Sequence, residues 1–203
     1  MPVIDLPDDE KLKSWPVSGL INIIDLEYTS WEGAMESKWS EKWQWREVVQ
    51  IGAIKVSGAD FDVVNVFNRF VRPEQNPILS DYFISLSGIS QQKMELLAVP
   101  AEQAIKELIE FLDNDTTIFN GNDGRVLREN IIIGNLDLYF KRNQMFNFRP
   151  LLSCNLRRAE SELVSSQLPQ IAGFKVDLVA HTALDDCRAI ASALSYWRRT
   201  NIL

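Results

Sequence analysis

Two carboxylates stand two residues apart where an apolar run of the sequence ends. Residues 21–24 are rich in isoleucine, as expected of a strand buried on both faces, and Asp25 and Glu27 follow them. In a strand, residues i and i+2 share a face, so both carboxylates would point the same way. Water, a basic neighbour or a hard divalent cation would relieve their repulsion. The ordinary alternative for an isolated pair is a strand that ends in a polar turn. Only further acidic residues elsewhere in the chain can distinguish a metal site from such a turn.

Two further acids stand at the starts of helical segments. Residues 116–119 are expected to form a short strand that leads into a helix, so Asp123 would lie near a helix N-terminus at the edge of a sheet. Helix capping is the ordinary role of an acid there. Asp186 lies on the first turns of the last helical segment, five residues after His181, the only histidine of the chain. Acids near a helix N-terminus and a loop histidine are each common in proteins, so only their occurrence together indicates a functional site.

The elements that must position these residues alternate between strands and helices. Residues 48–56 and 61–71 are apolar runs on either side of a Ser-Gly-Ala-Asp turn, which predicts a hairpin. Further expected elements are a helix over 101–112, a helical segment over 124–140 with a break at Gly134, a possible strand over 151–154, a helix over 155–164 and a helix over 184–197. This order predicts an α/β domain with a mixed sheet and a central first strand. Ligand sites in such sheets lie beyond the strand ends, where Asp25 and Glu27 are placed.

Length and composition are those of one globular domain. The chain has 203 residues, 46% of them hydrophobic, and no apolar run reaches the ~18 residues of a membrane span. Residues 1–19 are expected to be an N-terminal arm, laid on the domain or partly disordered, ahead of a domain over 20–203. The start carries no export signal, so a cytoplasmic protein is expected. Cys154 and Cys187 fit neither a redox pair nor a zinc site, and reduced thiols are expected.

The net charge of −7 argues at first against a nucleic-acid partner, because phosphate binding usually comes with a basic excess. A site that held two divalent cations would offset four of these negative charges. Local basic groups, and not the total charge, would then decide what the protein binds.

Taken together, these stretches resemble the DEDDh branch of the DEDD superfamily of 3′-to-5′ exonucleases. Residues 25–29, 122–123 and 181–186 match its three motifs in the right order, and residues 86–89 and 51–53 match a loop and a strand of the family. The resemblance covers roughly 20–200. A tryptophan soon after the first motif and a glycine before the second are similar to the Eri-like RNA exonucleases. The Trp-rich stretch and the looser second motif depart from the common pattern.

The resemblance implies a fold, a set of cofactors and a reaction. The fold would be an RNase H-like three-layer α/β fold with a central mixed five-stranded sheet flanked by helices. Two Mg²⁺ or Mn²⁺ ions would be held by Asp25, Glu27, Asp123 and Asp186, with Asp25 bridging both, and would drive phosphodiester hydrolysis. His181 would be the general base, since an imidazole exchanges protons near neutral pH. Single-stranded RNA or DNA would be shortened from the 3′ end to nucleoside 5′-monophosphates, with RNA slightly favoured.

Substrate contacts are implied in the same way. The expected positions are Leu26, Thr29, Trp31, Leu86, Gly88, Ile89 and Arg125. Arg128, Lys141, Arg142, Arg157 and Arg158 are further candidates for phosphate contacts, although solvated helix charges explain most of these equally well. One of Trp31, Trp39 and Trp43 is expected to stack on a base, against the ordinary alternative that all three belong to the core.

Two other classes of function fit the sequence less well. A non-catalytic nucleic-acid or protein-binding module with the same fold is the first alternative, but such a module has no reason to keep like charges crowded together. A nucleotide-binding oxidoreductase is a weaker alternative, because Gly121 and Gly124 form no G-x-G-x-x-G pattern after the first strand.

Overall fold

The strand that carries the first acidic pair, β2 (Leu20–Tyr28), lies inside a mixed sheet. The computed structural model describes residues 10–140, 144–179 and 181–203. β2 pairs antiparallel with β3 (Val48–Ser57) and parallel with β5 (Thr116–Phe119). The central position expected for this strand is therefore confirmed.

Three more strands complete the sheet on its two sides. β4 (Val63–Phe70) pairs antiparallel with β3, which confirms the hairpin. On the other side, β6 (Met145–Asn147) runs parallel to β5, and β1 (Glu10–Lys11) runs parallel to β6 at the edge. The order β1-β6-β5-β2-β3-β4 has six strands, where five were expected. Two- and three-residue strands are too short to produce a hydrophobic period, so the sequence pattern did not reveal β1 or β6.

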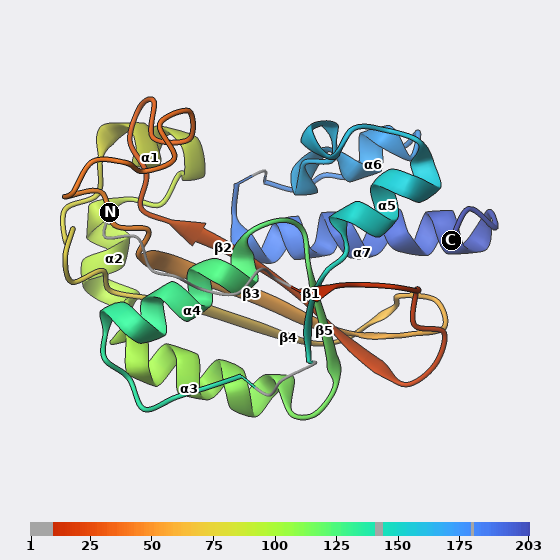
Figure 1. Ribbon diagram of the computed structural model, residues 1–203, viewed down its shortest axis with the longest axis horizontal. Helices are drawn as coiled ribbons and strands as arrows, with labels where there is room; N and C mark the ends of the chain where they lie inside the picture. Colours follow the sequence, from red (N-terminus) through yellow and green to blue (C-terminus); the bar gives the residue numbers. More distant parts are fainter. Residues whose placement is uncertain (1–9, 141–143, 180) are drawn as a thin grey trace.

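Helices cover both faces of the sheet. Figure 1 shows α5 (Arg149–Leu156), α6 (Leu168–Ile171) and α7 (Ala183–Arg199) on one side, with α3 (Ala101–Leu112) and α4 (Asp123–Ile133) on the other. The side chains of β2 alternate between these layers. Ile21 and Ile23 pack in the core with α7, and Ile24 and Leu26 pack in the core with α3 and α4. The three-layer α/β class expected from the sequence is confirmed.

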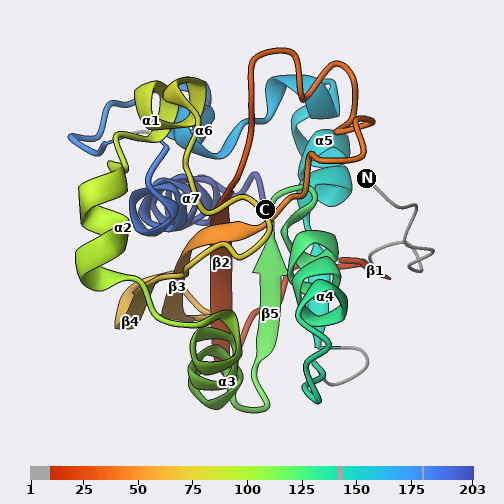
Figure 2. The ribbon, with the colours of Figure 1, turned by 90° about the vertical axis from the view of Figure 1, so that its left-hand side faces the viewer.

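Two short helices, α1 (Asp81–Ser87) and α2 (Gln91–Leu97), lie along the side of β3 and β4 (Figure 2). Each begins at a serine whose hydroxyl accepts a hydrogen bond from a backbone N–H of the first turn, Ser80 from Phe83 and Ser90 from Lys93. Gly88 ends α1 in the left-handed conformation, with φ of 67°. The segment 86–89, expected to be a loop, is therefore the end of α1 and its link to α2.

The segments after β5 correct three predictions. Helix α4 ends at Ile133 and Gly134 caps it, so the break expected at Gly134 is confirmed. The helix expected to continue to Phe140 is wrong, since no helix follows Gly134 in that stretch. The possible strand over 151–154 and the helix over 155–164 are both wrong. Helix α5 spans the first of these and ends at Leu156, and a 3₁₀ turn at Glu160–Glu162 follows. Pro150 in the first turn favours the helix, whereas a short apolar run alone fits a strand equally well.

The described part of the N-terminal arm lies on the domain. The Trp15 ring packs against Phe148 at a centroid distance of 5.8 Å, and the Pro16 carbonyl accepts a hydrogen bond from Arg198. Within the described ranges, no helix combines the length and the apolar character that crossing a bilayer requires. Cys154 is exposed and Cys187 is buried, and both are free thiols.

Candidate active site

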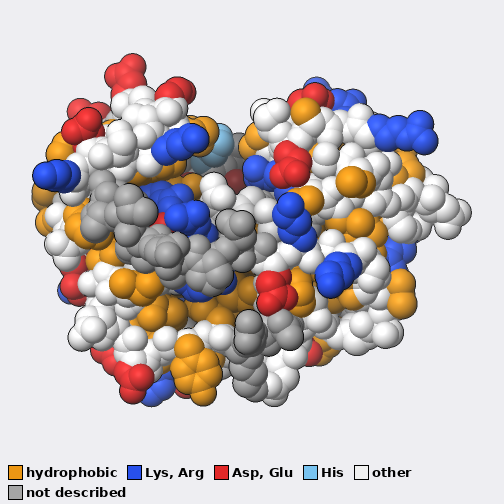
Figure 3. Space-filling model, viewed as in Figure 1, with side chains coloured by type: hydrophobic (Ala, Val, Ile, Leu, Met, Phe, Trp, Pro, Cys, Tyr) orange, Lys and Arg blue, Asp and Glu red, His pale blue; other side chains and the backbone are white. Residues whose placement is uncertain are grey.

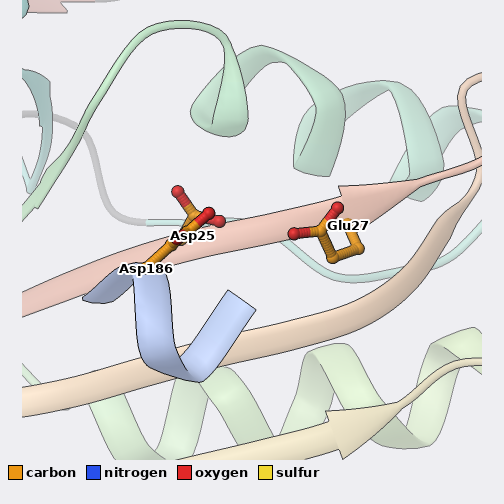
Figure 4. Close-up of side chains that lie close together, drawn as sticks. All are labelled: Asp25, Glu27 and Asp186. Atoms are coloured by element: carbon orange, nitrogen blue, oxygen red, sulfur yellow. The ribbon is translucent and has the colours of Figure 1, made fainter. Parts of the chain in front are cut away.

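Three carboxylates meet where β2 faces the first turn of α7. The alternation of β2 places Asp25 and Glu27 on the same face as Ile21 and Ile23, which is the face that α7 covers. Asp186 approaches from α7, and Figure 4 shows its side chain against that of Asp25, with Glu27 farther along the strand. The ligand oxygens of the three acids lie within 4.8 Å of one another, and all three residues are buried. The structure therefore brings these three acids together, and their roles as metal ligands stay predictions.

Gly52 allows α7 to come this close. Gly52 lies opposite Asp25 in the β2–β3 pairing. A Cβ at that position would lie 2.3 Å from the Ala183 carbonyl carbon, so only glycine fits where the helix starts. One turn on, the buried Cys187 thiol donates to the carbonyls of Ile23, at 3.5 Å, and Gly52, at 3.4 Å. Backbone contact between strand and helix thus fixes the separation of Asp25 and Asp186.

Asp123 joins the site from the other layer. It opens α4, directly after the loop that follows β5, and is buried. Its Oδ1 accepts a hydrogen bond of 3.2 Å from the Leu26 backbone N–H, which lies between the two acids of β2. Asp123 is not part of the three-acid cluster itself, which consists of Asp25, Glu27 and Asp186. The structure therefore brings the fourth acid beside the cluster without making it one of the closest oxygen donors.

Burial raises the pKa of every acid at this site, and neighbouring negative charges add to the shift. The pKa of Asp25 is well above its ordinary value, because of burial and the charges of Asp123, Asp186 and Glu27. Burial, with the charges of Asp186 and Asp123, raises the pKa of Glu27 to about 8. Burial also raises the pKa of Asp123 to about 7, against the lowering effect of Arg149, and the pKa of Asp186 to about 7.

This donor set fits divalent cations. The cluster offers hard carboxylate oxygens at close range, and these are the donors that Mg²⁺ and Mn²⁺ prefer. The raised pKa values of Asp25 and Glu27, caused first by burial and then by the neighbouring carboxylates, show that the charged forms of these acids are disfavoured in the folded chain. A bound cation would relieve the repulsion and would hold the carboxylates in the charged form.

His181 lies immediately before α7 in a strained backbone conformation. Its φ is 60°, which is uncommon for a residue with a side chain. Its backbone N–H forms a hydrogen bond with the Asp186 carboxylate and lowers the pKa of that group. The His181 side chain is half-buried, and the cluster of closely spaced ligand atoms consists of Asp25, Glu27 and Asp186 without it. The histidine is thus tied to the site through its main chain, and its role as general base stays a prediction.

Leu26 and Thr29, which flank Glu27 on either side, have contacts within the fold. Thr29 is buried. Its hydroxyl donates a hydrogen bond to the Trp45 carbonyl and accepts one from the Glu47 N–H at 3.0 Å, which holds the end of the loop between β2 and β3. Trp39 Nε1 donates to the Thr29 carbonyl at 3.1 Å. Leu26 packs in the core with α3 and α4. These contacts give Leu26 and Thr29 a structural role, and their contact with substrate stays a prediction.

The tryptophans of the loop between β2 and β3 differ in exposure. Trp39 is buried at 7% exposure, whereas Trp43 is 51% exposed. Trp31 is half-buried and packs edge-on against Trp43, with ring centroids 4.8 Å apart. Trp39 therefore follows the ordinary core alternative. Trp31 and Trp43 form an aromatic pair of which one ring reaches the surface.

The remaining expected substrate contacts lie on two elements. At the end of α1, Leu86 and Gly88 are exposed and Ile89 is buried. Gly88 and Ile89 line a cavity of about 430 Å³ together with Thr182 from the segment that leads into α7. Figure 3 shows the surface hollowed between the part that holds α1 and the part that holds α5 and α6, with Lys and Arg side chains on both sides.

Several expected phosphate contacts have other partners or lie outside the described residues. Arg125 forms an ion pair with Glu129 at 3.2 Å. Arg158 pairs with Glu162 at 3.1 Å on the exposed surface. Lys141 and Arg142 lie outside the part of the chain that the structure describes. These basic residues stay candidates for phosphate contacts.

Sequence reasoning missed three polar residues behind the acidic cluster. Asn120, Arg149 and Ser165 are joined by hydrogen bonds, and hydrogen bonding from Ser165 lowers the pKa of Asp25. They lie on three separate segments, after β5, in α5 and in the 3₁₀ turn Ser165–Gln167. Their spacing follows no period, so no sequence signal could have grouped them.

Comparison with known proteins gives a consistent result. The family model described as Exonuclease matches residues 23–194. ERI1 exoribonuclease 2 of Xenopus laevis is 30% identical over 73 residues, which is 36% of this chain and 10% of that protein. The probable 3′-5′ exonuclease KapD of Bacillus subtilis is 32% identical over 123 residues, which is 59% of this chain and 56% of that protein. The matches thus span between a tenth and just over half of the length of these relatives.

A similar fold occurs among solved structures. The nuclease domain of 3′hExo, a DEDDh family member bound to rAMP, has a TM-score of 0.78 and 21% sequence identity. The superposition covers 90% of this chain and 93% of that domain. At this level of identity the similarity concerns the fold.

Proposed function

Since the chain belongs to the exonuclease family, whose model spans most of its length, we propose that it is a metal-dependent 3′-to-5′ exonuclease. The substrate would be the 3′ end of single-stranded RNA or DNA, and the product a nucleoside 5′-monophosphate. One observation carries the proposal. The oxygens of Asp25, Glu27 and Asp186, buried on two elements far apart in sequence, lie within 4.8 Å of one another. A domain that only binds nucleic acid gains nothing from such crowding.

The four acids would share the task of holding two cations. Asp25, Glu27 and Asp186 would hold one ion, and Asp25 would also contact the second, which Asp123 would support. When bound, two divalent cations activate the attacking water and stabilise the departing sugar oxygen. The backbone contacts at Gly52 hold the start of α7, and with it Asp186, close to Asp25. The donors are therefore placed in advance.

His181 would take the proton from the attacking water. Carboxylates that hold a cation are poor bases, whereas a neutral imidazole accepts a proton near neutral pH. The contact of its backbone N–H with Asp186 supports this role, because it ties the residue to a member of the acidic cluster. The strained backbone at φ of 60° fits a residue held in place by function.

A single strand is the expected substrate, and RNA is slightly favoured. Bases in a duplex are paired and stacked, so feeding a terminal nucleotide into a buried acidic site requires unpairing that costs a few kcal/mol. Two of the similar proteins are an exoribonuclease by name and a nuclease domain bound to rAMP, which supports RNA. A cytoplasmic location stays a prediction from the sequence.

The test is hydrolysis of 5′-end-labelled single-stranded RNA and DNA of the same sequence, with Mg²⁺, with Mn²⁺ or with a chelator. We expect stepwise shortening from the 3′ end that requires the cation and is lost in Asp25→Ala. Asp115→Ala is the matched control, because Asp115 pairs with Lys55 just before β5 and away from the cluster. Binding of the strand without shortening would favour the non-catalytic alternative. Equal rates on 3′-phosphorylated and 3′-hydroxyl ends would contradict the substrate.

A further inference from the structure

A chain of hydrogen bonds leads from Arg149 to the acidic end of β2. Arg149 Nε donates to Asn120 Oδ1 at 2.8 Å, and Arg149 Nη2 donates to the Asn120 carbonyl at 2.6 Å. Asn120 Nδ2 in turn donates to Ser165 Oγ at 3.0 Å and to the Leu163 carbonyl at 2.9 Å. The last member, Ser165, lies beside Asp25, and its hydroxyl lowers the pKa of that carboxyl. Three segments far apart in sequence thus converge behind one carboxylate.

The direction of donation along this chain is fixed by Arg149. A guanidinium has only donors, so the amide oxygen of Asn120 must face it and the amide nitrogen must face Ser165. Because Ser165 Oγ accepts from that nitrogen, the hydroxyl proton of Ser165 is left to donate to Asp25. Each bond polarises the next, so the chain presents a strengthened donor to the carboxylate.

The surroundings are built to hold this chain. Asn120 is 4% exposed and Ser165 is 7% exposed, so neither exchanges its partners freely with water. Gly121 has φ of 115°, and a Cβ there would lie 2.7 Å from Arg149 Nη2. Asn147 Oδ1 accepts from the N–H groups of both Gly121, at 3.1 Å, and Arg149, at 3.0 Å. The loop that forms the second motif is therefore shaped around the guanidinium of Arg149.

We propose that Arg149, Asn120 and Ser165 are positioning residues that orient the Asp25 carboxylate for cation binding. The inference rests on the proposed function, since it concerns the same cations. Without the Ser165 donor, the Asp25 side chain is free to turn about its Cα–Cβ and Cβ–Cγ bonds under repulsion from its acidic neighbours. With the donor in place, one oxygen is held and the other is directed toward the cluster. Residues that orient metal ligands in this way usually change affinity by about 10–100-fold when removed.

The test is the affinity of the full chain for Mn²⁺, measured by calorimetry without nucleic acid. We expect Ser165→Ala to raise Kd by about 10-fold or more, and Ser165→Thr, which keeps the hydroxyl, to restore it. Ser195→Ala is the matched control, since Ser195 is equally buried at 7% exposure but lies more than two turns along α7 from Asp186. Melting in the presence of a chelator should be alike for the two alanine variants.

A second variant tests the direction of the chain. Asn120→Asp keeps the shape and the bonds from Arg149 but replaces the donor that faces Ser165 with an acceptor, so the hydroxyl proton turns away from Asp25. Added negative charge alone would tighten Mn²⁺ binding, whereas the proposal predicts weaker binding than in the wild type.

The outcomes separate the two proposals. Mn²⁺ binding to Ser165→Ala or to Asn120→Asp as tight as to the wild type would overturn the positioning role and leave the proposed function intact. A wild-type protein that binds no Mn²⁺ would overturn both. Weaker binding in both variants, with Ser165→Thr restored, would establish the role.

Discussion

Helix α4 carries two buried acids with opposite surroundings. Glu129, in its last turns, forms ion pairs with Arg46 from the loop between β2 and β3 and with Arg125 one turn earlier on the same helix. Asp123, in the first turn, lies beside the other acids of the site, and its pKa is raised to about 7. At one end of the helix, two arginine side chains of the protein itself therefore neutralise the buried acid. At the other end the chain leaves carboxylates crowded together.

This difference separates a structural cluster from a functional one. Arg46 lies over the Trp39 ring at 5.5 Å, and Asn130 joins the Arg46 carbonyl to the Val48 N–H, so the Glu129 cluster fastens the loop to α4. Its charges are balanced within the fold. The cluster at Asp25 is balanced only when cations bind, which makes it dependent on a ligand. Substitutions at the two clusters should therefore affect different properties.

The largest expected effect concerns the reaction and leaves stability unchanged. His181→Ala should lower kcat by ~10²–10⁴-fold, because a general base lowers the barrier and does not coordinate the cation. The rise in melting temperature with Mn²⁺ should persist in this variant. Single-turnover kinetics beside thermal melting would measure both. Loss of the Mn²⁺ effect would show that His181 is a ligand instead, and unchanged kcat would remove it from the mechanism.

Removal of one carboxylate should change the free energy of unfolding in opposite directions at the two clusters. Glu129→Ala removes the partner of a buried arginine and should lower the free energy of unfolding by about 3–5 kcal/mol. Asp25→Asn removes repulsion and should stabilise the cation-free protein, by ~1 kcal/mol, or about 2–4 °C in Tm. Chemical denaturation with a chelator present compares them. If both variants are destabilised alike, the two clusters do not differ as described.

Cations should stabilise the protein only through the Asp25 cluster. At a hundredfold excess over Kd, Mn²⁺ should add ~2.7 kcal/mol to the free energy of unfolding. Without cations, raised pKa values make the folded state prefer protonated acids, so this part of the stability falls as pH rises from about 4 to about 8. The Mn²⁺ effect should therefore be larger at pH 8 than at pH 6. Thermal melting indifferent to millimolar Mn²⁺ would argue against a metal site.

The smallest expected effect concerns the loop that the Glu129 cluster fastens. Trp43→Ala should raise KM by an amount equivalent to ~1–3 kcal/mol while kcat changes less, if the exposed ring stacks on a base. Trp39→Ala, which removes a buried ring, should lower stability without a selective change in KM. Steady-state kinetics on single-stranded RNA would distinguish them. Equal KM values for wild type and Trp43→Ala would return Trp43 to a structural role.

How reliably the sequence predicts a helix or strand depends on the number of residues in that element. The nine residues of β2 begin with a long apolar run that leads into two acids spaced by two, and the seventeen residues of α7 carry a helical period. The type of both elements, and the face that Asp25 and Glu27 share, could therefore be predicted. The four residues 151–154 fit strand and helix equally well, and that prediction was wrong. The two residues of β1 carry no period at all.

The candidate site divides in the same way. Asp25, Glu27 and Asp186 were grouped because motifs of known order connect them, and the structure brings them together. Gly52 matched a family strand, but the close approach of α7 that it permits depends on tertiary packing. Asn120, Arg149 and Ser165 contact one another across segments with no shared pattern, so only the fold reveals them.

Calorimetric titration of Mn²⁺ at pH 7, in buffers of different ionisation enthalpy, tests the metal site most directly. Because burial raises the pKa of Glu27 to about 8 and those of Asp123 and Asp186 to about 7, the cation-free acids carry protons that a bound cation displaces. We predict tight binding with a net release of protons in the wild type and in Asp115→Ala, and loss of both in Asp25→Asn. Binding that is absent in the wild type, or equally tight in Asp25→Asn, would contradict a metal centre at the end of β2.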